Sequence, residues 1–135
     1  MAQNKRLKLI NILNNNTSWP IILENVSSKD FETSVVLPAN INSSELGIKI
    51  DDKGLCYPSW LNNIKKQEGE NTILLVIDKL DEISFEEQEK FYGIIKYKGV
   101  NGYKFPSETQ IIITVKNKDN VSKKISSLCL SYKVE

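Results

Sequence analysis

One run of seven residues dominates the hydrophobic pattern of the chain. Residues 72–78 read TILLVID: six apolar or β-branched residues with no polar alternation, closed by a carboxylate. A continuous apolar run of this length, bounded by the polar residues 69–71, is typical of a strand buried on both faces. Such strands belong to parallel sheets, in which functional residues lie just beyond the carboxyl ends of the strands. We therefore predict a central parallel strand, with Asp78 as the first candidate for a functional acid.

The rest of the pattern alternates short strands with helical segments. Asn101-Gly102 lies between apolar residues and predicts a tight hairpin. Ser84 and Glu87 have the spacing of a capping box at a helix start. The expected strands are 21–23, 35–37, 72–78, 110–115 and 130–134. The expected helices are 7–13, 57–66, 84–97 and 121–128. Residues 42–48 are expected to form a loop, and residues 51–54 a turn. This alternation predicts an α/β fold with a mainly parallel sheet of about five strands flanked by helices.

Composition narrows the class of protein. At 135 residues the chain is expected to form a single domain. Its 18 basic and 17 acidic residues give a net charge of +1, so no global field favours nucleic acid or an anionic membrane. The sequence has no apolar run of about 18 residues, so we expect no transmembrane helix. The first eight residues lack the features of a signal peptide, so we expect a cytoplasmic protein.

Histidine is absent from the sequence, and cysteine is rare. The lack of histidine excludes catalytic triads, general bases and metal sites that depend on an imidazole. Cys56 and Cys129 are too few for a structural zinc site. We expect both to be small buried side chains in a reducing compartment.

The order of these motifs resembles the AAA+ ATPase core, most closely its MoxR/dynein-related group. In that family an apolar strand ending in Asp-Glu (Walker B) precedes a helix entered by Ser/Pro-x-x-Gln, then a hairpin and a further strand. The matching segments are 78–88, 100–106 and 110–117, and upstream 45–48 and 57–61 resemble the group's Asp-Leu-x-Gly-x-Pro and Pro-Pro-x-Trp-Leu segments. The resemblance covers roughly residues 44–135, and it implies a three-layer core like that of P-loop NTPases.

The resemblance also implies roles for individual residues. Asp78 takes the Walker B position, which is associated with Mg²⁺, and Asn117 takes the sensor-1 position, which orients water near the γ-phosphate of ATP. From the residues alone, Asp78 is first read as a strand-end carboxylate that caps a turn, and Asn117 as a turn residue. Lys29 is equally a solvated loop lysine.

Several positions depart from the family pattern. Lys79 occupies the place of the glutamate that would activate water, and an ammonium cannot act as that base. Glu82 comes too late in the chain to replace it. The segment after residues 21–23 has no glycine and offers only Ser28 and Lys29 in place of the phosphate-binding Walker A loop. Ser131 stands where the family has an arginine finger, and the sequence ends without the helical lid.

These departures favour one interpretation over two others. The first is an inactive AAA+-like domain, residues 1–135, that acts as an interaction or scaffold module. It expects a protein partner and neither nucleic acid nor a membrane, and it leaves oligomerisation open. It expects no catalytic residue and no cofactor. The second is a weak ATP-binding or ATPase domain that uses Ser28 and Lys29, with Mg²⁺ at Asp78. The third is a receiver-like domain with an acidic pocket of Asp51, Asp52 and Asp78, but the interval between them is too short for the intervening elements.

Overall fold

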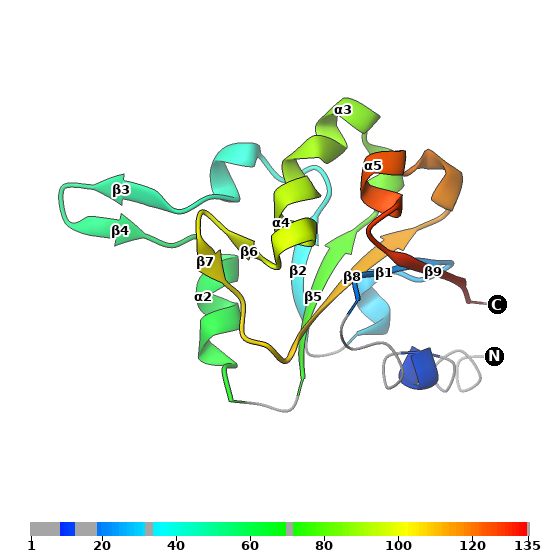
Figure 1. Cartoon of the computed structure of the whole chain (residues 1–135), viewed down its shortest axis with the longest axis horizontal. Helices are drawn as coiled ribbons and strands as arrows, with labels where there is room; N and C mark the ends of the chain where they lie inside the picture. The colour runs from blue at the N-terminus through cyan, green and yellow to red at the C-terminus, as the bar shows by residue number, and fades with distance from the viewer. Residues whose placement is uncertain (1–8, 13–18, 32–33, 70–71, 135) are drawn as a thin grey trace.

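A five-stranded parallel sheet forms the centre of the molecule (Figure 1). The structure is a computed structural model that describes residues 9–12, 19–31, 34–69 and 72–134. The strand order is β2-β5-β8-β1-β9, and every pair of neighbours is parallel. The strands are β1 (Ile21–Glu24), β2 (Ser34–Pro38), β5 (Ile73–Asp78), β8 (Thr109–Val115) and β9 (Leu130–Lys133). The predicted α/β class and parallel sheet are confirmed.

The two strands with continuous apolar sequence occupy interior positions of the sheet. β5 pairs with β2 on one side and β8 on the other, with Leu75 opposite Ile111. All seven residues of β8 are buried. Because both faces of these strands are covered, apolar residues are favoured at every position and the alternation of a half-exposed strand is lost.

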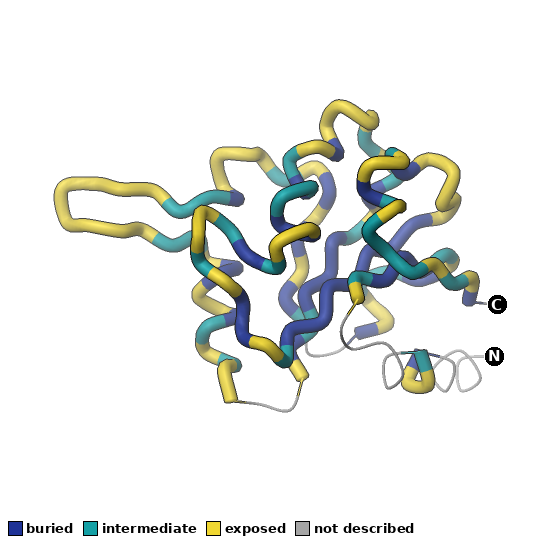
Figure 2. Tube along the Cα trace, in the orientation of Figure 1, coloured by how far each residue is buried: buried dark blue, intermediate teal, exposed yellow. Residues whose placement is uncertain are grey.

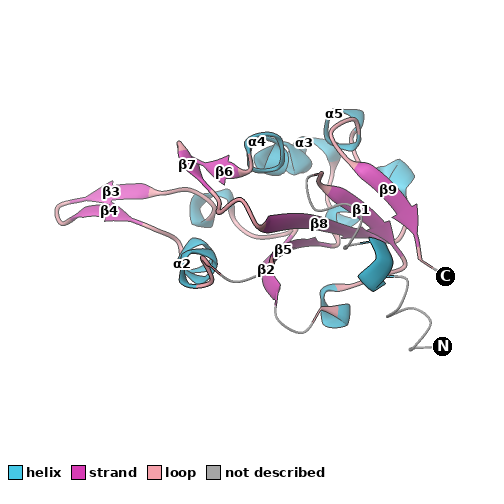
Figure 3. Cartoon of the chain, turned by 60° about the horizontal axis from the view of Figure 1, so that its bottom comes forward, coloured by secondary structure: helices cyan, strands magenta, loops and turns pink. Residues whose placement is uncertain are grey.

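Helices cover one face of the sheet, and Figure 3 shows α3, α4 and α5 together on this side. The helices are α2 (Ser59–Lys66), α3 (Phe85–Gln88), α4 (Tyr92–Tyr97) and α5 (Lys123–Ser126). Leu61, Phe91 and Ile95 from this layer pack with Leu75 and Ile113 of the sheet in the larger of two core clusters. Figure 2 shows the interior strands of the sheet, β1, β5 and β8, among the most deeply buried parts of the trace.

The opposite face has a thinner cover. Its core cluster contains Leu9 from the helical turn at residues 9–12, and Val26 and Phe31 from the connection between β1 and β2. They pack on alternate sheet residues such as Val76 and Ile112. The remaining residues of the helix expected at 7–13 lie outside the described part of the chain. The sheet with both covers forms the three-layer core expected of a P-loop-NTPase-like fold.

Two of the expected helices differ from their predicted extents. Between α3 and α4 the segment tightens into a 3₁₀ turn, Glu89–Phe91, so residues 85–97 are helical throughout but do not form one regular helix. The helix expected at 121–128 begins later because the Ser122 side chain accepts a hydrogen bond from the Ile125 amide, which fixes Ser122 as the N-cap. Ser84 likewise caps α3 through the Glu87 amide, as predicted.

Two hairpins lie within the described residues, one predicted and one not. Asn101 and Gly102, with φ of 50° and 85°, form the turn between β6 (Gly99–Val100) and β7 (Tyr103–Lys104), as the Asn-Gly signal predicts. The second hairpin, β3 (Lys49–Asp51) and β4 (Gly54–Cys56), projects away from the sheet (Figure 1). Its turn was predicted, but its strands were not. All six strand residues are exposed, so the sequence lacks the burial pattern of a strand.

The prediction that both cysteines are buried is wrong for Cys56. Its thiol lies on the exposed hairpin and donates to Asp51 Oδ2 at 2.9 Å. This hydrogen bond to Asp51 raises the pKa of the Cys56 thiol. Cys129 is half-buried beside α5 and donates to the carbonyl of Ile125 at 3.3 Å, and burial raises its pKa to about 12.

We expect the two thiols to differ sharply toward iodoacetamide near neutral pH. The thiolate is the reactive form, and a pKa of about 12 lowers its population at Cys129 on the order of a thousandfold relative to an ordinary thiol. Cys56 should therefore be alkylated first in the folded protein, and Asp51→Asn should accelerate it by removing the acceptor that favours the thiol. Mass spectrometry of timed samples measures both rates, with urea-unfolded protein as the control in which the two sites react alike. Equal rates in the folded protein would contradict this prediction.

No helix in the described residues is long and apolar enough to cross a membrane.

Candidate functional site

Asp78 lies at the carboxyl end of β5 and is the centre of a closed hydrogen-bond network. Its Oδ1 accepts from the Ser28 amide at 2.9 Å and from Thr114 Oγ1 at 2.7 Å. Its Oδ2 accepts from Ser28 Oγ at 3.2 Å. The Thr114 hydroxyl, on a fully buried residue of β8, also accepts from the Lys79 amide at 2.9 Å. Both carboxylate oxygens of Asp78 therefore have protein donors.

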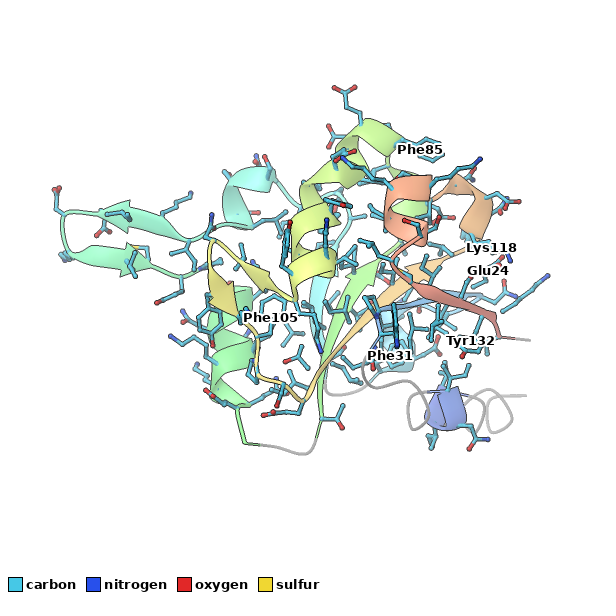
Figure 4. The ribbon with its side chains drawn as sticks, viewed as in Figure 1. Glu24, Phe31, Phe85, Phe105, Lys118 and Tyr132 are labelled. Carbon is cyan, nitrogen blue, oxygen red and sulfur yellow. The ribbon has the colours of Figure 1, made fainter. Side chains whose placement is uncertain are left out.

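Ser28 reaches Asp78 because of the route taken between β1 and β2. β2 lies beyond β8 and β5 in the sheet, so the connection must cross the ends of both strands. Only nine residues separate Glu24 from Ser34, and among those that the structure describes Ser28–Asp30 form a 3₁₀ turn. Val26 and Phe31 are buried on either side of this turn, and Figure 4 labels Phe31 on the sheet's thinly covered face. The two apolar anchors hold the Ser28 turn against Asp78.

This connection has no room for a Walker A loop and its helix. A phosphate cradle needs a run of free amides, usually provided by glycines, at the start of a helix. Here the Ser28 amide is used by Asp78, and the Ser27 amide donates to Asp30 Oδ2 at 3.0 Å. Asn25 adopts a left-handed φ of 68° and donates its amide to Val115 of β8 at 3.1 Å. These amides face the protein and are not available to a phosphate.

Asn117 follows β8 and is occupied by local turn contacts. Its side-chain oxygen accepts from the Asp119 amide at 3.0 Å and caps the 3₁₀ turn Lys118–Asn120. Its own amide donates to Asp81 Oδ2 at 3.0 Å, and the Lys116 amide donates to the same oxygen at 2.9 Å. The structure therefore places Asn117 at the end of the strand next to β5, as expected, with its side chain in a turn.

The fold can now be compared with known proteins. The chain is similar in structure to a DNA polymerase III gamma subunit-related protein from Thermotoga maritima, with a TM-score of 0.58 and 13% sequence identity. The match covers 97% of this chain and 46% of the other, so this chain spans about half the length of the structure it matches. The likeness shows that the two proteins share an α/β fold. No family model matches the sequence, nor does any curated protein, and nothing in the likeness supports the MoxR type.

The other candidate residues are distributed around the α/β core. Lys79 adopts a left-handed φ of 63° and its side chain is exposed. Lys29 and Glu82 are exposed as well. Ser131 lies exposed on the edge strand β9. Of the predicted nucleotide-site residues, the structure brings Ser28 together with Asp78 through direct hydrogen bonds.

The acidic residues do not form a shared pocket. Asp51 and Asp52 belong to the projecting hairpin (Figure 1), whereas Asp78 lies in the sheet, so the acidic pocket of a receiver-like domain is not assembled. Among the described residues, no group of three or more acidic, cysteine or histidine side chains is arranged to hold a metal. Asp78 is the candidate ligand named from sequence, and a cation there would compete with its three hydrogen bonds.

Two structural residues near the site were missed from sequence. Asp81 ties the turn after β5 to the end of β8 through the amides of Lys116 and Asn117. Gln88 is fully buried and hydrogen-bonds four backbone groups from three segments. The signal for Gln88 was its place in the helix-entry motif, and the signal for Asp81 was a second acid three residues after Asp78.

Proposed function

We propose that this chain is a catalytically inactive AAA+-like domain that serves as an interaction or scaffold module. The observation that carries the proposal is the pair of hydrogen bonds from Ser28 to Asp78. They hold the β1–β2 connection over the carboxyl end of β5, where a nucleotide hydrolase of this fold would place phosphate and Mg²⁺. The site is filled by the protein's own chain.

The chemistry of the neighbouring residues supports the same conclusion. Hydrolysis needs a carboxylate or an equivalent group to activate water, and Lys79 offers an ammonium at that position. Catalysis in this fold also relies on a protein cation beside the transferred phosphoryl group, and Ser131 is uncharged. The Asn117 side chain is engaged by the Asp119 amide. Mg²⁺-ATP would have to break several good hydrogen bonds and would gain few in return.

The finer assignment to the MoxR/dynein-related type is part of this proposal. Its support is the order of motifs along residues 44–135, which the structure places in the sequence β5, α3, the β6–β7 hairpin and β8. The structural likeness supports the fold, and the support for the MoxR/dynein-related type comes from this motif order.

We expect no protein-dependent ATP turnover in the presence of Mg²⁺. The missing phosphate cradle is the main reason, so restoring the acid by Lys79→Glu should not create activity. A coupled phosphate-release assay measures turnover in the wild type and in this variant. Asp78→Asn is the matched control, because any background from a contaminating ATPase would be unchanged in it. Turnover that Asp78→Asn abolishes would contradict the proposal and favour the alternative of a weak ATPase.

A further inference from the structure

β2 forms one edge of the sheet, and its outer side carries main-chain groups without partners. Within the sheet β2 pairs with β5 alone. The Ala39 amide, directly after β2, donates to the Asp78 carbonyl at 2.9 Å, so the main-chain groups of the odd-numbered residues of β2 point toward β5. Those of Ser34 and Val36 therefore point outward, and among the described residues neither main-chain group of Val36 has a hydrogen-bond partner. Pro38, which has no N–H, limits this free edge to Ser34 and Val36. Such an edge is a template for a further strand.

Two adjoining hollows follow this free edge. The first has a volume of about 540 Å³ and lies between α2 and the start of β2, with Ser34 and Lys66 in its lining. The second, of about 380 Å³, continues from Val36 past Leu37 to Glu45. Both are lined by Val36 and the start of α2, and we call them together the β2 groove. Figure 3 shows α2 beside the sheet edge that β2 forms. The groove therefore runs along β2 from Ser34 to Leu37, which is the length of a short extended peptide.

The charges along the β2 groove give it a direction. Lys66 lies at the Ser34 end, and it is the charged residue in the lining of the first hollow. Glu45 and Lys49 lie together at the Leu37 end, where their charges balance. A strand that runs antiparallel to β2 ends beside Ser34, so its terminal carboxylate would meet Lys66. A parallel strand would end beside Glu45 instead. Charge complementarity therefore favours the antiparallel direction.

The Lys66 ammonium makes no ion pair or hydrogen bond within the described part of the chain. The neighbouring Lys65 faces elsewhere: its Nζ lies 4.0 Å from the ring centroid of Tyr57 and 5.6 Å from that of Tyr103. Glu68 lies on the Tyr103 side as well, where burial and the Glu68 charge raise the pKa of Tyr103. The positive charge of Lys66 is therefore free to pair with a carboxylate that a partner brings.

We propose that the β2 groove binds an extended segment at the C-terminus of a partner protein, which adds to β2 as an antiparallel strand with its carboxylate at Lys66. The main chain of the partner exchanges hydrogen bonds with Val36 and with Ser34, the residues whose groups point outward. Partner residues opposite these two share the face of Val36, which is 39% exposed, so apolar β-branched residues suit these places. The partner residue between them faces α2, where Asn63 lines the groove, and suits a polar side chain. The inference rests on the proposed interaction role and names the class of partner for it.

An amide NMR titration of the ¹⁵N-labelled full chain with the peptide acetyl-KTVTV, which carries a free C-terminal carboxylate, tests the proposal. Its middle and final valines are placed opposite Val36 and Ser34, and its threonines face α2. We expect saturable shifts of the amides of Val36 and Asn63 at up to millimolar peptide, because a few main-chain hydrogen bonds give a modest affinity. The Ser131 amide on β9, at the other edge of the sheet, is the internal control and should keep its chemical shift.

Matched probes and variants separate strand addition from non-specific adhesion. N-methylation of the middle valine removes the donor to the Val36 carbonyl and leaves the protein unchanged, and it should weaken binding about tenfold. A C-terminal amide removes the charge that faces Lys66 and should weaken binding about two- to fivefold. Lys66→Gln should abolish this difference between acid and amide, whereas Lys53→Gln, on the exposed hairpin turn, should retain it.

Three results would overturn the proposal: no saturable shift at Val36, equal binding of the N-methylated peptide, or an equal response of Ser131. A difference between acid and amide that survives Lys66→Gln would overturn the assigned direction of the strand. The ATP turnover assay is independent of all these results. Turnover would contradict the proposed loss of catalysis whatever the peptide does, whereas a peptide that fails to bind a protein without turnover would overturn this inference alone.

Discussion

Replacing Asp78 with alanine should lower the free energy of unfolding by about 3 kcal/mol. The substitution removes an ionised acceptor of three hydrogen bonds, each worth roughly 1.5–3 kcal/mol when the group is charged, although the values do not add fully. It also leaves the Thr114 hydroxyl without its acceptor on a fully buried residue. The Ser28 turn loses its polar attachment to the sheet. Urea denaturation should show a lower midpoint with an unchanged slope.

The sign of this effect distinguishes a structural acid from a catalytic one. Acids that are maintained for metal binding often cost stability, so their removal is neutral or stabilising. Asp52→Ala, on the exposed hairpin turn, is the matched control, and we expect a change within about 0.5 kcal/mol. An Asp78→Ala variant as stable as the wild type would show that the hydrogen bonds to Ser28 and Thr114 do not hold the connection.

Gln88→Leu should destabilise the fold by a similar amount, about 3 kcal/mol. Gln88 Nε2 donates to the carbonyls of Leu80, Ile83 and Asn120 at 3.3, 3.2 and 2.8 Å, and its Oε1 accepts from the Ser122 amide at 2.8 Å. Leucine has a similar volume but leaves the carbonyls of Ile83 and Asn120 and the Ser122 amide without this partner, whereas the Leu80 carbonyl keeps the Ile83 amide at 3.4 Å. Each unsatisfied buried group costs roughly 1–3 kcal/mol.

Thermal or urea unfolding measures the Gln88→Leu effect against a matched glutamine. Gln67 is partly exposed and makes one side-chain bond, to the Asn63 carbonyl at 3.3 Å, so Gln67→Leu should change stability by less than about 0.5 kcal/mol. If both variants behaved alike, Gln88 would not be the residue that joins α3 to the turns after β5 and β8.

The predictable parts of the fold are those in which the local sequence indicates whether the residues are buried. β5 is apolar from Ile73 to Ile77, and β8 is apolar from Ile111 to Ile113, because both faces of these strands are covered, so their sequences identify them as central parallel strands. Asn101-Gly102 specifies its turn through backbone conformation alone. In each case the relevant physics lies within a few consecutive residues.

The parts that were not predictable depend on contacts between distant residues or on the absence of burial. Asp78 was identified at a strand end, but its hydrogen-bond donors, Ser28 and Thr114, lie 50 and 36 residues away in the sequence. The residues around Ser28 give no sequence signal for its contact with Asp78. Gln88 matched a motif without revealing its bonds to three separate segments. The β3–β4 hairpin was missed because each of its strands has three residues, too few to establish a period, and all six are exposed. Whether the nucleotide site is truly vestigial stays a prediction.

The most direct measurement for the central claim is an amide NMR titration of the full chain with Mg²⁺-ATP. Our account predicts that the amide of Ser28 and its neighbours in the β1–β2 connection, together with that of Asp78, keep their chemical shifts up to millimolar nucleotide. Saturable shifts confined to these amides would contradict it, because they would show that the connection held by Asp78 can still open to receive a phosphate.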